Sequence, residues 1–157
     1  MPPSQFVKFH NLAQIVSAFC GSQRPARIRT IDRDSEGFSG AVVLRVVVEG
    51  TKLAPQAEYC LRGWPPDSLQ RDRLAGLHRL LEHIHRCGVK QVPVPLKSQF
   101  GTTLYTEAGQ FWQLEPWMPG QADFSSAPTD ARLRTAMIVL AQWHDAATRF
   151  EARTSEA

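Results

Sequence analysis

The sequence predicts an α+β fold in which helices flank a five-stranded antiparallel sheet. Segments dense in β-branched residues, such as 42–48, are separated by connections too short for a helical crossover, which favours antiparallel pairing. Other segments repeat apolar residues at steps of three and four, which is typical of one face of a helix. With 157 residues, of which 43% are hydrophobic and 21% charged, the chain has the length and composition of a single globular domain over residues 1–157.

Helical spacing marks the beginning, the middle and the last part of the chain. Gly21 is the expected stop of the first helix, and Asp67 or Ser68 is the expected N-cap of the second, which Gly88 ends. The predicted helices span 6–19, 69–86 and 129–150.

The predicted strands lie between these helices. The first strand alternates imperfectly, because Ile31 falls on the same face as Arg27 and Arg29. The last two strands form a hairpin around Gly109. The predicted strands span 26–32, 42–48, 58–62, 102–106 and 111–114.

A glycine-containing turn joins the first two predicted strands. Gly37 and Gly40 lack a Cβ, so the backbone there can turn tightly and present N–H groups to an anion. Arg62 ends the third strand and is placed to meet phosphate charge beneath such a turn. An ordinary hairpin with one exposed arginine is the alternative, because two glycines three residues apart are a weak motif.

Charge and cysteine content exclude several classes of protein. Lys and Arg number 18 against 15 for Asp and Glu, and they are scattered rather than clustered, so we expect no nucleic-acid surface. The three cysteines have neither metal spacing nor a disulfide framework. His78, His83 and His85 have no spacing of three or four residues and therefore predict no metal site. Without a signal peptide or a long apolar run, we expect a cytoplasmic protein that does not enter a membrane.

Six short segments stand out by their order and spacing along the chain. They are Gly-Phe-Ser-Gly-Ala at 37–41, Tyr-Cys-Leu-Arg-Gly-Trp-Pro at 59–65, Val-Pro-Val-Pro-Leu at 92–96, Gly-Thr-Thr-Leu at 101–104, Leu-Glu-Pro-Trp-Met-Pro-Gly at 114–120 and Leu-Ala-Gln-Trp-His at 140–144. Together they resemble the N-terminal lobe of a protein-kinase-like fold. The sequences of these segments are similar to those of the aminoglycoside phosphotransferase and choline/homoserine kinase group, and the resemblance covers roughly residues 10–150.

This resemblance implies a site for ATP, which the complete family enzymes use with Mg²⁺. The phosphate-covering loop would be the turn 35–40, and Arg62 would replace the lysine that usually meets the α- and β-phosphates. Arg62 would be oriented by an acid on the following helix, either Asp72 or Glu82. The backbone groups of Glu115 and Trp117 would face the adenine edge. The cofactor-binding residues implied in this way are Gly37, Phe38, Ser39, Gly40, Arg62, Asp72, Glu115 and Trp117.

The resemblance also implies that part of the machinery is missing from these 157 residues. Phosphoryl transfer needs a base-like Asp and metal ligands, which the family carries in a His-Gly-Asp…Asn loop of a second lobe. Asp123, Asp130 and Asp145 fall outside such a motif. Residues 10–120 would be the N-terminal lobe through the hinge, and 128–150 the helix that begins the missing lobe. We therefore expect neither catalytic residues nor metal ligands in this chain, and no kinase activity from it alone.

Three interpretations remain open at this point. The chain is the nucleotide-binding part of a truncated or split small-molecule kinase, or a non-catalytic nucleotide- or protein-binding module derived from one, or an unrelated scaffold. In the first two, the apolar band of the last helix would bind a separate C-terminal lobe or a second copy of the chain. That band comprises Met137, Ile138, Leu140 and Trp143.

Overall fold

The computed structural model describes residues 11–20, 27–34, 41–49, 57–65, 70–121 and 123–151. Its elements, in chain order, are α1 (Leu12–Cys20), β1 (Arg27–Asp34), β2 (Val42–Glu49), β3 (Ala57–Trp64), α2 (Arg71–Arg86), β4 (Tyr105–Glu107), β5 (Gln110–Pro116) and α3 (Asp130–Thr148). The predicted α+β class is confirmed.

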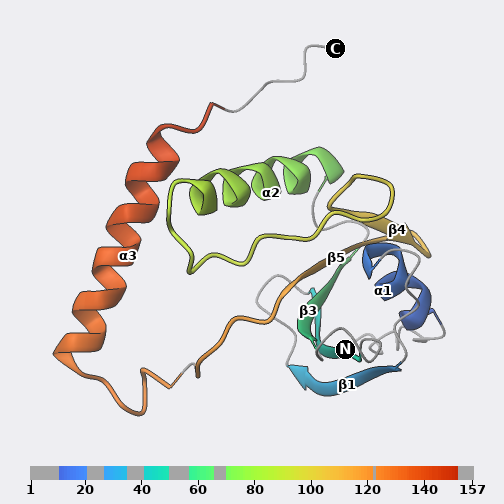
Figure 1. Ribbon diagram of the computed structural model, residues 1–157, viewed down its shortest axis with the longest axis horizontal. Coiled ribbons are helices and arrows are strands. Elements are labelled where there is room, and N and C mark those ends of the chain that lie inside the picture. Colours follow the sequence, from blue (N-terminus) through green and yellow to red (C-terminus); the bar gives the residue numbers. More distant parts are fainter. Residues whose placement is uncertain are drawn as a thin grey trace, which may run out of the picture.

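The strands form one antiparallel sheet in the order β1-β2-β3-β5-β4 (Figure 1). The β1–β2 register shifts between Thr30 and Asp32, which explains the imperfect alternation of the first strand. The β4–β5 hairpin turns at Ala108 and Gly109, whose φ angles are 51° and 76°. Positive φ at both positions gives the strands the twist that a tight hairpin requires.

One face of the sheet is apolar and lies under α1. Alternating residues of β2, β3 and β5 point to this face, most of them apolar, and the apolar stripe of α1 covers them. The buried residues of α1 and the three strands form one cluster, which comprises Ile15, Val16, Phe19, Leu44, Val46, Leu61, Trp112 and Leu114. This cluster is the main hydrophobic core of the described part of the chain.

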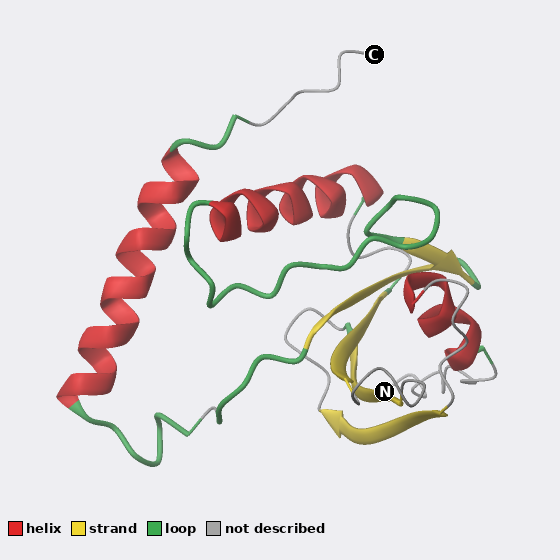
Figure 2. Ribbon diagram, in the orientation of Figure 1, coloured by secondary structure: helices red, strands yellow, loops and turns green. Residues whose placement is uncertain are grey.

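The opposite face of the sheet lies under α2. The first half of this helix places Leu74 against Trp64 and Leu104 in a second, smaller cluster. The N-cap is Gln70, which makes no side-chain capping bond, so the predicted cap at Asp67 or Ser68 is wrong. After the helix, a long loop runs back beside α2 to reach β4 (Figure 2). Helices α1 and α2 thus pack on opposite faces of the sheet.

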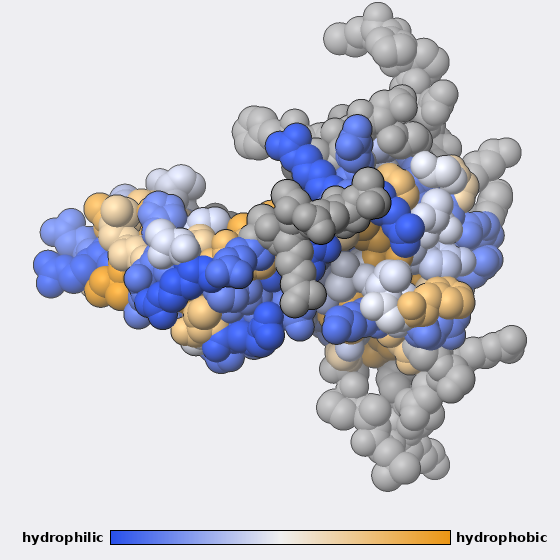
Figure 3. All heavy atoms as spheres, turned by 90° about the horizontal axis from the view of Figure 1, so that it is seen from above, coloured by the Kyte–Doolittle hydropathy of each residue, from blue (hydrophilic) through white to orange (hydrophobic). Residues whose placement is uncertain are grey.

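The third helix stands apart from the sheet (Figure 1). It begins as predicted at Thr129, whose hydroxyl accepts a hydrogen bond from the Arg132 backbone N–H at 3.2 Å. Ala146 and Trp143 pack on the end of α2 around Ile84. Hydrophobic residues lie between hydrophilic ones along this arm, at the left of Figure 3. The large exposed apolar side chains on it are Leu133, Met137, Ile138 and Leu140.

The fourth strand is shorter at its start than predicted. Thr102 lies outside β4, and its hydroxyl donates to the Leu104 carbonyl oxygen at 2.7 Å. A second bond, from the Ser98 N–H to the Thr102 carbonyl oxygen at 2.7 Å, closes a turn. These local bonds compete with strand pairing and delay β4 until Tyr105.

Among the described helices, none is long and apolar enough to cross a bilayer.

Candidate functional site

Arg62 lies on the α2 side of the sheet, at a position where β3 is flanked by β2 and β5. Its register partner on β5 is Gln113. The Arg62 Nη2 donates to Glu115 Oε1 at 2.9 Å, and the Glu115 side chain is only 5% exposed whereas that of Arg62 is 31% exposed. The guanidinium is therefore anchored at one end by a buried carboxylate and reaches the surface at the other. The exposed part of this guanidinium can therefore contact a charged ligand.

Among the described residues, Glu115 accepts a hydrogen bond from one of the five N–H groups of the Arg62 guanidinium. The Nη2–Glu115 bond is the hydrogen bond that Arg62 makes in the described structure, and its Nε is buried without a partner. The guanidinium also lies over the Trp64 ring, 5.7 Å from the ring centroid. A planar fork with unused N–H groups suits the oxygens of a phosphate.

A buried polar network supports the carboxylate that holds Arg62. Gln113 Nε2 donates to Glu115 Oε2 at 3.0 Å, and Gln113 Oε1 accepts from Trp64 Nε1 at 2.7 Å. The indole N–H can only donate, so it fixes which end of the Gln113 amide is the oxygen. His78 Nε2 lies 3.0 Å from the same oxygen and must therefore carry a hydrogen. The network links β3, β5 and α2.

His78 is the residue that α2 contributes to this network. It is 3% exposed, and its Nδ1 lies 2.7 Å from the Thr103 hydroxyl, which donates to it. Burial lowers the pKa of His78, an effect that Gln113 and Glu115 oppose. The imidazole is thus a neutral link with a defined tautomer between the loop before β4 and the sheet.

Cys60 lies beside the ion pair on the same face of β3. Burial, followed by the charge of Glu115, raises the pKa of its thiol to about 12. A thiol that stays protonated at neutral pH is a poor nucleophile. Cys60 is therefore a buried, protonated thiol next to Arg62.

A second ion pair lies further along this face, near the end of β5. Arg45 Nη2 donates to Glu58 Oε2 at 2.6 Å, and its guanidinium lies 4.7 Å from the Trp117 ring centroid. The backbone N–H of Trp117 donates to the Glu58 carbonyl oxygen at 3.1 Å. The family resemblance implied that backbone groups of Glu115 and Trp117 face the adenine edge, but the Trp117 N–H is bonded to Glu58 in this structure.

Comparison with models of known protein families shows which family the chain belongs to. The model of the phosphotransferase enzyme family matches residues 30–156, which is well over half of the chain. The chain belongs to the phosphotransferase enzyme family. The predicted resemblance to aminoglycoside phosphotransferases is confirmed at this level. No curated protein matches the sequence.

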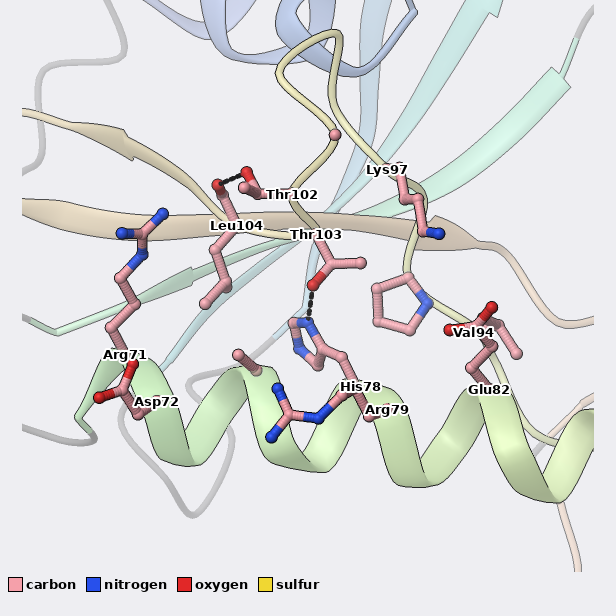
Figure 4. A pocket seen from close by; sticks show the side chains of 13 residues that line it. Arg71, Asp72, His78, Arg79, Glu82, Val94, Lys97, Thr102, Thr103 and Leu104 are labelled. Atoms are coloured by element: carbon pink, nitrogen blue, oxygen red, sulfur yellow. Dashed lines mark hydrogen bonds between the residues drawn. The ribbon is translucent and has the colours of Figure 1, made fainter. Parts of the chain in front are cut away.

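The two acids predicted to orient Arg62 lie elsewhere in this phosphotransferase chain. Asp72 and Glu82 line a cavity of about 430 Å³ between α2 and the loop before β4. Figure 4 shows Asp72, Glu82, Arg71, Arg79 and Lys97 around this cavity, with His78 pointing inward to Thr103. Within the described residues, Arg62 pairs with Glu115 instead. The partner of the cation comes from the neighbouring strand, because β5 lies directly beside β3.

The predicted phosphate loop, residues 35–40, lies outside the residues that the structure describes. Gly37, Phe38, Ser39 and Gly40 all lie outside the described residues. The described residues contain no group of three or more His, Cys, Asp or Glu side chains that could hold a metal ion.

Sequence reasoning missed the side chains that hold Arg62. Gln113, His78 and the carboxylate of Glu115 were assigned no such role, although all three are buried polar groups. One signal was available: Gln113 and Glu115 alternate with apolar residues in a strand, so both point to one face. The contact with α2 could not be found in this way, since it depends on tertiary packing.

Proposed function

We propose that this chain supplies the nucleotide-binding lobe of an aminoglycoside phosphotransferase-type kinase, which transfers phosphate from ATP to a small molecule. The observation that carries the proposal is the Arg62–Glu115 pair of 2.9 Å, in which a buried carboxylate orients a partly exposed guanidinium. Membership of the phosphotransferase enzyme family supports a phosphate-binding role for this cation. Arg62 would bind the phosphates of ATP, beneath the loop that contains Gly37 and Gly40.

The state of the Arg62 donors supports this role. The Arg62 side chain is 31% exposed, so part of its guanidinium reaches the surface, where Arg can bind phosphate through two parallel hydrogen bonds. The buried Nε is not accessible to a ligand from solution and takes no part in this contact. The adenine would lie along residues 115–117, whose Trp117 N–H would have to exchange its bond to Glu58 for one to the base.

The proposal concerns binding and not turnover. Phosphoryl transfer requires an acceptor-positioning Asp and metal ligands, which these 157 residues do not present in the family's His-Gly-Asp order. The complete activity would therefore need a catalytic lobe. Mg²⁺ enters here only as the ion that accompanies ATP.

Calorimetry of the purified 157-residue chain with magnesium-ATP tests the proposal. Arg62→Ala should weaken binding by about tenfold or more, because a charge-assisted phosphate contact is lost. Arg73→Ala is the matched control, since it removes the same charge from an exposed position on α2. Equal affinity of wild type and Arg62→Ala, or a folded wild type that binds no nucleotide, would contradict the proposal.

The exposed apolar side chains of α3 favour a second function, that of a binding module. Trp143, which the predicted band included, packs against the end of α2 instead. Leu133, Met137, Ile138 and Leu140 are exposed apolar side chains on one helix. We propose that they contact a separate catalytic lobe or a second copy of the chain. If copies associate, Met137→Glu should lower the mass measured by light scattering at high concentration, whereas Thr135→Glu, outside the band, should not. One-chain mass at every concentration would contradict self-association.

A further inference from the structure

The helix α2 reaches Arg62 without an acidic side chain of its own. Asp72 and Glu82 line the cavity toward the loop before β4, and Arg62 pairs with Glu115 of β5. The α2 residue that contacts the network around this pair is His78. Any effect of the position of α2 on Arg62 would therefore pass through the imidazole.

Three consecutive hydrogen bonds connect His78 to Arg62. His78 Nε2 donates to Gln113 Oε1 at 3.0 Å, and Gln113 Nε2 donates to Glu115 Oε2 at 3.0 Å. Glu115 Oε1 then accepts from Arg62 Nη2 at 2.9 Å. His78, Gln113 and Glu115 are each less than 5% exposed, so water does not readily replace these bonds.

Because of the direction of these bonds, loss of the His78 donor should affect the orientation of Glu115 and Arg62 at the other end of the network. Two donors, from Trp64 and His78, meet at the Gln113 oxygen and turn the amide NH₂ toward Glu115. If the His78 donor is removed, Gln113 Oε1 loses one of the two hydrogen bonds that hold it on this side of the amide. A rotated amide would put its oxygen against the carboxylate, and the carboxylate would lose its fixed orientation.

We propose that His78 is a positioning residue for Arg62, acting through Gln113 and Glu115. The consequence for ATP rests on the proposed function, in which Arg62 meets the nucleotide phosphates. Thr103 holds the other ring nitrogen, so the loop that lines the cavity also fixes the imidazole (Figure 4). Movement of α2 or of this loop is thereby coupled to the guanidinium.

Three variants separate positioning from stability. His78→Leu fills a similar volume but donates no hydrogen bond, whereas His78→Gln keeps an N–H that can reach the Gln113 oxygen. Ile84→Val is the control, because it removes a buried methyl group from the same helix outside the network. Thermal unfolding of each variant shows whether it is folded at the temperature of measurement.

The first readout is the affinity for magnesium-ATP in a double-mutant cycle with Arg62→Ala. His78→Leu should weaken binding about five- to twentyfold, a coupling that residues of one hydrogen-bond network commonly show. His78→Gln should bind within about twofold of wild type, as should Ile84→Val. In the Arg62→Ala background, His78→Leu should have no further effect. An equal loss in both backgrounds would overturn the proposal.

The second readout needs no nucleotide. The buried Nε–H of Arg62 should give a slowly exchanging signal in a ¹H–¹⁵N spectrum, assigned by its loss in Arg62→Lys. His78→Leu should speed its exchange at least about tenfold while His78→Gln restores it, as expected when a buried bond network opens. Unchanged exchange in His78→Leu overturns the positioning role. If wild type binds no ATP, the proposed function fails, and this spectrum alone still decides the role of His78.

Discussion

The two faces of the sheet are built on opposite principles, although they share the same strands. The face under α1 is hydrocarbon, with Leu44, Leu61 and Leu114 almost fully buried. The face under α2 carries an ion pair and a chain of hydrogen bonds at the matching positions of β3 and β5. Strand alternation alone separates these environments, because neighbouring residues point to opposite sides.

The difference shows which face stabilises the fold and which face holds a charged side chain in place. Full burial of an aliphatic side chain contributes about 1.5–3 kcal/mol, so the α1 face provides most of the stability. A hydrogen bond adds a net of only about 0.5–1.5 kcal/mol, and a buried ion pair can cost as much as it gains. The Arg62–Glu115 network is thus poorly explained by stability. It fixes the direction of a charged group on the sheet.

The largest effect is expected on the apolar face. Leu61→Ala should lower the free energy of unfolding by about 2–5 kcal/mol, because the side chain is 0% exposed and leaves a cavity. Leu77→Ala, at a 43% exposed position of α2, is the control and should cost under about 1 kcal/mol. Urea unfolding of both variants measures the contrast. Equal losses would mean that the α1 face is not the stabilising one.

A close approach on the same apolar face gives the next effect. A Cβ at Gly63 would lie 2.7 Å from Cζ3 of Trp112, its register partner on β5. Gly63→Ala should therefore cost about 1–3 kcal/mol through overpacking against a rigid ring. The double variant with Trp112→Phe should lose less than the sum of the single losses, since the smaller ring relieves the clash. Additive losses in thermal unfolding would contradict this packing.

On the polar face, two ion pairs offer a matched comparison of smaller effects. Glu115→Gln should cost about 1–2 kcal/mol, because it leaves the partly buried Arg62 without a charged partner. Glu58→Gln breaks the pair with Arg45, in which both side chains are more than a quarter exposed, and should cost about 0–1 kcal/mol. Glu115→Gln should also weaken magnesium-ATP binding. The reverse order of stability losses would show that burial does not set the importance of these pairs.

The sequence predicted the elements better than it predicted their partners. Helix and strand patterns are local, so the valine-rich strand β2 and the Thr129 cap of α3 could be found by spacing and residue type. The partner of Arg62 was expected at Asp72 or Glu82, nearby in the chain, but it is Glu115, 53 residues away. That contact depends on β5 joining the edge of β3, and no local pattern specifies which strands become neighbours.

The smallest expected effect is a pH dependence that only the polar face should show. Burial lowers the pKa of His78 below its usual 6.5, with the charges of Glu115 and Arg62 acting in opposite directions. In the unfolded chain the imidazole takes up a proton at higher pH than in the folded chain. The contribution of His78 is therefore fully present above pH 6.5 and is lost as the pH falls through the lowered folded value.

His78→Gln removes this titration while it keeps a donor for Gln113. Between pH 7.5 and 5, wild type should lose more stability than His78→Gln, as measured by urea unfolding at matched ionic strength. The other histidines are present in both proteins and cancel in the difference. Parallel pH profiles would mean that the His78 imidazole is no harder to protonate in the fold than in water, which would remove the case for a neutral, fixed tautomer behind Arg62.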